Sequence, residues 1–133
     1  MKNSILTKII LILGGLIGLY VGVGLVFFPV QLQAQSDIFI NGNISHLSET
    51  RAPGTAILVA SILILFGAFR AKWAQLSLFI STLFFLSYGL GRLISLALDG
   101  IPAEGLFIAM LAELFMGLLA LIALIRTRRL ERQ

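Results

Sequence analysis

The sequence contains no cysteine, a single histidine, His46, and few charged residues, which make up 12% of its 133 positions. The lack of cysteine excludes disulfide bonds, thiolate metal sites and a cysteine nucleophile. One histidine cannot build a histidine-rich metal cluster or a bis-histidine haem site, so we expect no metal and no cofactor. Hydrolase triads, zinc-protease motifs and phosphate-binding loops are also missing, so no catalytic residue is assigned.

Hydrophobic residues, in contrast, make up 59% of the chain, and its mean hydropathy is +1.03. These values exclude a water-soluble globular domain, which needs more polar residues to cover its surface. The net charge of +4 comes from basic residues that stand between apolar runs. This pattern is typical of loops that orient membrane helices, and we expect no nucleic-acid partner.

Four apolar runs are long enough to cross hydrocarbon about 30 Å thick, which takes about 20 helical residues. Barrel strands would alternate apolar and polar residues, and these runs do not. The sequence therefore predicts an all-α integral membrane four-helix bundle, in which 1–133 form a single membrane domain. The predicted spans are 9–30, 52–69, 73–98 and 106–125.

The connections between the later spans are short, at Arg70 to Lys72 and at Asp99 to Pro102, which predicts antiparallel neighbours. The first connection, the outward loop 31–51, is long. Its Ile38-Phe39-Ile40 patch is interpreted as either a short strand or a segment lying at the membrane interface. Thr50 is a candidate N-cap for the second span, with Pro53 in its first turn.

The distribution of lysine and arginine predicts the orientation in the membrane. Eight of the ten basic residues fall on one side of the predicted spans, whereas Arg51 is alone in the loops of the other side. By the positive-inside rule, both termini should be cytoplasmic. The eight residues are Lys2, Lys8, Arg70, Lys72, Arg126, Arg128, Arg129 and Arg132.

Gly14, Gly18 and Gly22 form a GxxxGxxxG stripe in the first span. Small residues at this spacing let a second helix approach closely. Packing against another span of the same chain is favoured over a homodimer face.

Two ionisable residues, Arg92 and Glu113, lie within the predicted spans, where a charge costs roughly 2.5 to 3.5 kcal/mol. Helical spacing places Arg92 on a polar face of the third span, and Glu113 lies on a small-residue stripe of the fourth. We expect the two side chains to meet inside the bundle. The polar face consists of Ser81, Phe85, Tyr88, Arg92, Ser95 and Asp99, and Ser77, Ser81 and Ser95 are expected to bond carbonyls of their own helix.

Two interpretations of these charges remain open. In the first, a polar pocket opens to the outside, where Arg51 and Arg92 hold an anionic head group and Glu113 exchanges a proton or accepts a hydrogen bond. In the second, Arg92 and Glu113 form a structural ion pair that binds nothing. The candidate binding residues are Glu49, Arg51, Tyr88, Arg92, Ser95, Asp99 and Glu113.

The chain resembles an uncharacterised family of small bacterial four-helix integral membrane proteins, a domain of unknown function. The likeness runs from about Asn43 to Glu113 and is carried by Ser48-Glu49-x-Arg51, Gly91-Arg92-x-x-Ser95, Asp99-Gly100-x-Pro102 and Glu113. The resemblance implies a multi-pass protein of the bacterial inner membrane. It implies no activity.

Three functions follow, in order of preference. The first is binding or helping to move a small amphipathic or anionic molecule in the outward pocket. The second is an accessory subunit of a larger membrane complex, with a membrane-protein partner or a second copy docked on the glycine stripe. The third is an enzyme acting on a lipid or quinone, disfavoured by the missing catalytic motifs.

Overall fold

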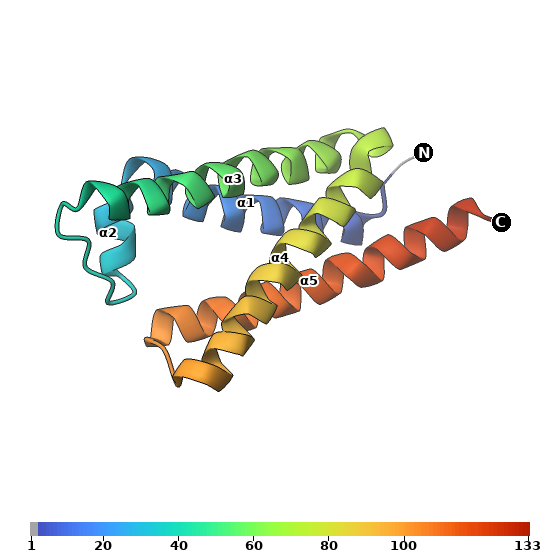
Figure 1. The fold of residues 1–133 in the computed structure, drawn as a ribbon. Coiled ribbons are helices and arrows are strands. Elements are labelled where there is room, and N and C mark those ends of the chain that lie inside the picture. Colours follow the sequence, from blue (N-terminus) through green and yellow to red (C-terminus); the bar gives the residue numbers. More distant parts are fainter. Residues whose placement is uncertain (1–2) are drawn as a thin grey trace.

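The computed structural model describes residues 3–133, in which four long helices and two short ones follow one another without any strand (Figure 1). Each of the four long helices is long and apolar enough to cross a membrane. The predicted all-α membrane bundle is therefore confirmed. The helices are α1 (Ile5–Phe27), α2 (Pro29–Ala34), α3 (Ile44–Phe69), the 3₁₀-helix η1 (Ala71–Trp73), α4 (Ala74–Asp99) and α5 (Glu104–Glu131).

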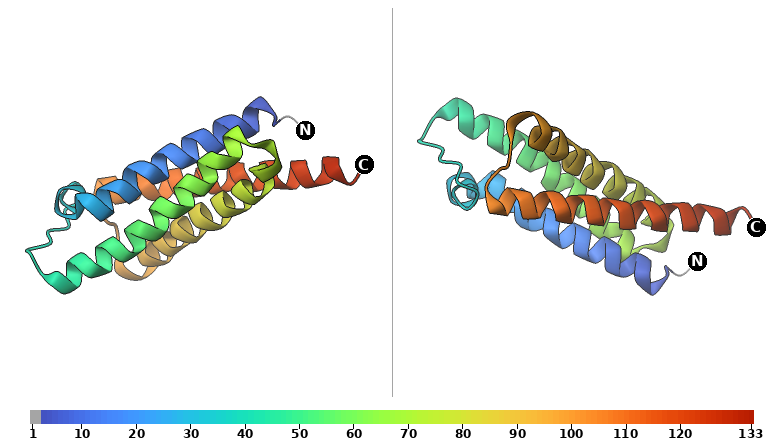
Figure 2. Two further views of the ribbon diagram at one scale, coloured as in Figure 1. Left: turned by 90° about the horizontal axis from the view of Figure 1, so that it is seen from above. Right: turned by 90° about the horizontal axis from the view of Figure 1, so that it is seen from below.

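The long helices pack as two antiparallel pairs, α1 with α3 and α4 with α5 (Figure 2). In the first pair, Gly22 faces the backbone of Leu58 and Gly54 faces Leu25. In the second pair, Gly89 faces Leu114. A glycine opposite a leucine lets the helix backbones approach closely, which is how helices associate where lipid removes the hydrophobic driving force.

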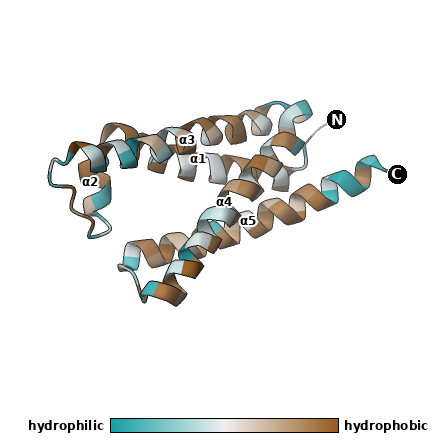
Figure 3. Cartoon of the chain, viewed as in Figure 1, coloured by the Kyte–Doolittle hydropathy of each residue, from teal (hydrophilic) through white to brown (hydrophobic). Residues whose placement is uncertain are grey.

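Hydrophobic residues dominate the four long helices, and hydrophilic residues gather in the turns between them and at the end of α5 (Figure 3). Large side chains such as Leu13, Leu63 and Leu118 are about half exposed, as expected of helix faces that meet lipid tails. The interior core combines Leu11, Ile64, Leu78, Phe85 and Met116 with small residues. The beginning of α1 and the end of α5 lie at the same end of the bundle (Figure 2).

Helix α1 ends at Phe27, before the end of the predicted span 9–30, because the helical backbone is interrupted at Phe28. Phe28 adopts a non-helical backbone (φ −130°, ψ 49°), and the short helix α2 begins at Pro29. The residue before a proline is pushed away from helical geometry, and proline itself fits the first turn of a helix. Residues 31–34 of the predicted outward loop are therefore helical and belong to α2.

Helix α3 begins at Ile44, eight residues before the predicted start of the second span at residue 52. The N-cap is Asn43, whose side chain accepts hydrogen bonds from the Ser45 and His46 amides at 2.9 and 3.2 Å. Thr50 is no cap; its hydroxyl donates to the His46 carbonyl. Pro53 lies inside α3, so the helix lacks the amide that would bond the Glu49 carbonyl.

What remains of the predicted outward loop is a nine-residue segment, 35–43, together with the first turns of α3. The segment forms no strand, so the strand interpretation of residues 38–40 is wrong. Ile40 is buried, whereas Phe39 is 69% exposed. At the other end of the chain, α5 continues six residues beyond the predicted end of its span at Ile125.

Candidate functional site

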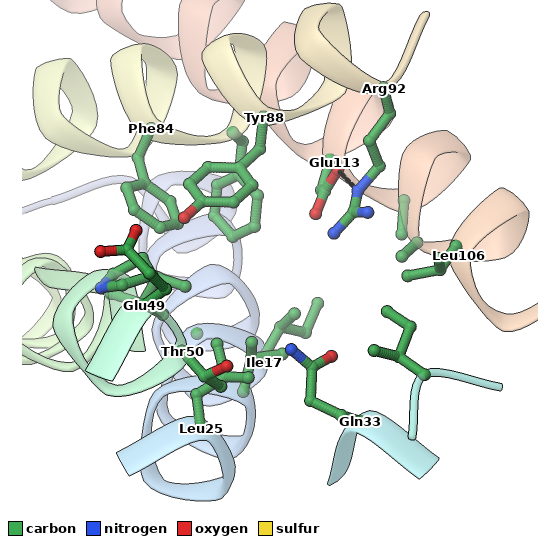
Figure 4. Close-up of a pocket in the computed structure, with 18 residues that line it drawn as sticks. Ile17, Leu25, Gln33, Glu49, Thr50, Phe84, Tyr88, Arg92, Leu106 and Glu113 are labelled. Atoms are coloured by element: carbon green, nitrogen blue, oxygen red, sulfur yellow. Dashed lines mark hydrogen bonds and ion pairs between the residues drawn. The ribbon is translucent and has the colours of Figure 1, made fainter. Parts of the chain in front are cut away.

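A cavity of about 350 Å³ lies between the two helix pairs, at the end of the bundle where α2 lies (Figure 4). Its size is within the range of pockets that take small molecules. Most of its surface is apolar, and six polar side chains reach it. The apolar lining includes Ile17, Val21, Leu25, Ile38, Pro53, Ile57, Phe84, Phe85 and Leu106; the polar residues are Gln33, Glu49, Thr50, Tyr88, Arg92 and Glu113.

An ion pair stands on the wall formed by α4 and α5. Arg92 Nε donates to Glu113 Oε2 at 2.8 Å, and the two side chains are 30% and 16% exposed. The antiparallel register of α4 and α5, fixed by Gly89 against Leu114, sets the two residues opposite each other. Each charge thereby finds the partner that an intramembrane charge requires.

The ion pair uses only part of the arginine's hydrogen-bonding capacity. A guanidinium carries five N–H donors, of which Nε–H is engaged by Glu113. The four N–H groups on the terminal nitrogens of Arg92 make no hydrogen bond to any residue in 3–133. Figure 4 shows these nitrogens directed into the cavity. The site can therefore hold an acceptor oxygen without breaking the ion pair.

Aromatic rings cover the deeper part of the same wall. The rings of Phe84 and Tyr88 lie 5.0 Å apart between centroids, and those of Phe84 and Phe85 lie 5.8 Å apart, edge to face. All three residues are on α4 and line the cavity. The opposite wall is formed by α1 and α3. Glu49, on α3, borders the cavity from this wall (Figure 4).

The seven candidate binding residues divide into two groups. Four line the cavity: Glu49, Tyr88, Arg92 and Glu113. The other three lie elsewhere. The Arg51 guanidinium donates to the Val26 carbonyl of α1, and the Ser95 hydroxyl donates to Asp99 Oδ2 at 2.9 Å on the exposed end of α4.

The three serines predicted to bond carbonyls of their own helix do not do so, and that prediction is wrong. Ser77 donates to the Leu63 carbonyl of α3 at 2.7 Å, and Ser95 bonds the Asp99 side chain. Ser81 is fully buried, and its hydroxyl has no partner among residues 3–133.

The glycine stripe of α1 faces other helices of the same chain. Gly18 faces Ser61, and Gly22 faces Leu58, both on α3. Gly14 faces Phe85 of α4, at 3.1 Å from where a Cβ would stand. Gly18 also lines the cavity, so the close approach of α1 and α3 shapes its floor.

Several cavity residues were not among the candidate binding residues predicted from the sequence. Phe84 precedes Tyr88 by four residues, and this helical spacing is a signal that could have revealed it. Gln33 and Ile38 come from α2 and the segment after it. No periodicity marks them, because their position depends on the break at Phe28.

The family assignment rests on most of the chain. Residues 6–124 match the family described as Domain of unknown function (DUF4345). The chain belongs to this family. No curated protein and no solved structure matches it. The predicted resemblance to an uncharacterised family is thereby confirmed. The matched region of this DUF4345 protein includes nearly all of α1, the whole of α3 and α4, α5 as far as Leu124, and every residue that lines the cavity.

Proposed function

We propose that this DUF4345 protein is a multi-pass protein of the bacterial inner membrane that binds a small amphipathic molecule in the cavity and helps to move it. The observation that carries the proposal is the guanidinium of Arg92, whose terminal N–H groups are free to donate hydrogen bonds into a mostly apolar cavity. A polar group of the ligand meets these donors, and its apolar part lies along residues such as Leu25 and Ile57.

The free N–H groups of Arg92 beside a largely apolar surface favour ligand binding over an enzymatic reaction. Glu113 is engaged by Arg92, so it serves first to orient the guanidinium. The accessory-subunit alternative rested on a glycine stripe open to a partner. Because Gly18 and Gly22 contact α3, that stripe lends the alternative no support.

A variant that fills the cavity tests the proposal. Ala112 lines the cavity, whereas the adjacent Leu111 is exposed on the outer face of α5. Ala112→Trp should reduce the lipid retained from a bacterial total lipid extract, counted by native mass spectrometry in a maltoside detergent. Leu111→Trp, the matched control, should retain as much as the unaltered protein. Equal retention by both variants would count against the cavity as the binding site.

The cavity opens toward the outside if the termini are cytoplasmic, as the positive-inside rule predicts. A reporter active only in the cytoplasm should give a signal when fused after Gln133. The same reporter inserted at Ser36, in the segment between α2 and α3, should be silent. The reverse pattern would place the cavity on the cytoplasmic side.

A further inference from the structure

The charges around the cavity constrain the ligand beyond what the proposed function requires. Two carboxylates, Glu49 and Glu113, and one guanidinium, Arg92, line the cavity. Glu113 and Arg92 neutralise each other through their ion pair. Glu49 makes neither an ion pair nor a hydrogen bond through its side chain with any part of residues 3–133, so the cavity presents an excess of one negative charge.

The nearest basic residue along α3 does not supply the missing positive charge. Arg51 lies two residues after Glu49, but its guanidinium donates to the Val26 carbonyl and it does not line the cavity. A simple anion held by Arg92 would therefore share the cavity with an unneutralised carboxylate. Glu49 is exposed, so solvent weakens this repulsion, but a carboxylate beside the cavity still disfavours a purely anionic ligand over one that also carries a positive charge.

The wall facing Glu49 is suited to a positive charge. Phe84 and Tyr88 line the cavity from α4, with ring centroids 5.0 Å apart. Aromatic faces attract ammonium groups, and a cluster of aromatic rings is the usual way in which proteins recognise quaternary ammonium. A carboxylate across from two rings completes a site for a cation.

We infer that the ligand is a zwitterionic phospholipid, with an ethanolamine or choline head group. Its ammonium lies between Glu49 and the rings of Phe84 and Tyr88, and its phosphate accepts hydrogen bonds from the free N–H groups of Arg92. Part of an acyl chain follows the apolar lining. This inference rests on the proposed function, because it specifies the head group of the amphipathic molecule.

Four single-chain lipids with the same acyl chain provide the test. The probes are lysophosphatidylcholine, lysophosphatidylethanolamine, the anionic lysophosphatidylglycerol and the uncharged monoacylglycerol, titrated into the full chain in a maltoside detergent. Calorimetry should give affinities for the two zwitterionic probes that are about tenfold higher than for the other two. A difference of this size is expected when one ammonium group contacts aromatic rings and a carboxylate.

The variant Glu49→Gln should weaken binding of the zwitterionic probes about five- to tenfold and leave monoacylglycerol binding unchanged. Glu104→Gln is the matched control, because Glu104 is an exposed carboxylate at the start of α5 that does not line the cavity. It should change nothing.

The outcomes separate the two claims. If lysophosphatidylglycerol binds as tightly as the zwitterionic probes, or if Glu49→Gln has no effect, the head-group inference is wrong while the proposed function stands. If the Ala112→Trp variant binds all four probes as well as the unaltered protein does, the probes bind elsewhere and both claims fail.

Discussion

The pair formed by α1 and α3 and the pair formed by α4 and α5 both set glycine against leucine, but within residues 3–133 only the second adds an ion pair. In the first pair the glycine contacts are uncharged, as between Gly22 and Leu58, and the guanidinium of Arg51 meets a backbone carbonyl and no opposite charge. In the second pair, Arg92 and Glu113 border the cavity. Both pairs line the cavity, so the comparison indicates that the second pair differs in adding a charged contact between its helices at the cavity wall.

The largest effect is expected from breaking the glycine contact of the first pair. A Cβ at Gly22 would lie 2.8 Å from both the Cα and the amide nitrogen of Leu58, so a side chain there must push backbone against backbone. Gly22→Leu should lower the free energy of unfolding by ~2 to 3 kcal/mol, measured by SDS titration in mixed micelles.

Gly91 offers a matched control, because it is a helical glycine with no described atom within 4 Å of a Cβ at its position. Gly91→Leu should leave stability unchanged or raise it, by up to about 1 kcal/mol from helix propensity. Equal losses at both positions would mean that close approach of α1 and α3 does not hold the first pair together.

Much of this comparison was accessible from the sequence, because periodicity reports which residues share a helix face. The spacing from Tyr88 to Arg92 and the depth of Glu113 predicted the side chains that meet in the second pair. The ends of the elements were less accessible. Asn43 rather than Thr50 caps α3. Where a helix begins before its apolar run, only the capping residue marks its start in the sequence, and several residues in this stretch are able to cap a helix.

The position of Arg51 outside the cavity has a similar cause. Counting charges near the outer ends of the spans placed Arg51 beside Arg92 in one site. Its direction, however, depends on where α3 begins and how α3 faces α1, and in the structure its guanidinium reaches the Val26 carbonyl. Sequence spacing gives the face of a residue within one helix, but not the rotation of that helix against its neighbours.

The second prediction removes the ion pair that distinguishes α4 and α5. Arg92→Leu or Glu113→Leu should each cost ~1 to 3 kcal/mol of unfolding free energy, less than a fully buried pair because the side chains are 30% and 16% exposed. The double leucine variant should recover much of the loss, since no charge is left without a partner.

Lipid retention should separate structure from function in the same variants. If the pair serves binding, the double variant regains stability but still retains less lipid from the extract than the unaltered protein. Full retention would support the purely structural interpretation of the pair. Losses that add up exactly in the double variant would show that the two side chains do not interact.

The third prediction concerns how the two pairs are joined. Ser77 of α4 donates to the Leu63 carbonyl of α3 at 2.7 Å, which links the second pair to the first. Ser77→Ala should cost about 0.5 to 1 kcal/mol, as measured for hydrogen bonds between membrane helices. Ser87→Ala is the control, because the Ser87 hydroxyl is exposed and bonds the Leu83 carbonyl of its own helix. A larger loss at Ser87 would argue against this link.

The smallest effect is expected at Arg51, and it separates the two arginines that the sequence grouped together. Arg51 is exposed and bonds the Val26 carbonyl within the first pair, so Arg51→Ala should cost only ~0.5 kcal/mol. Because Arg51 does not line the cavity, lipid retention should match that of the unaltered protein, whereas Arg92→Ala should reduce it. The measurement is lipid counting by native mass spectrometry on both variants from the same extract. If Arg51→Ala reduced retention as strongly as Arg92→Ala, the binding site would extend beyond the cavity to the outer end of α3.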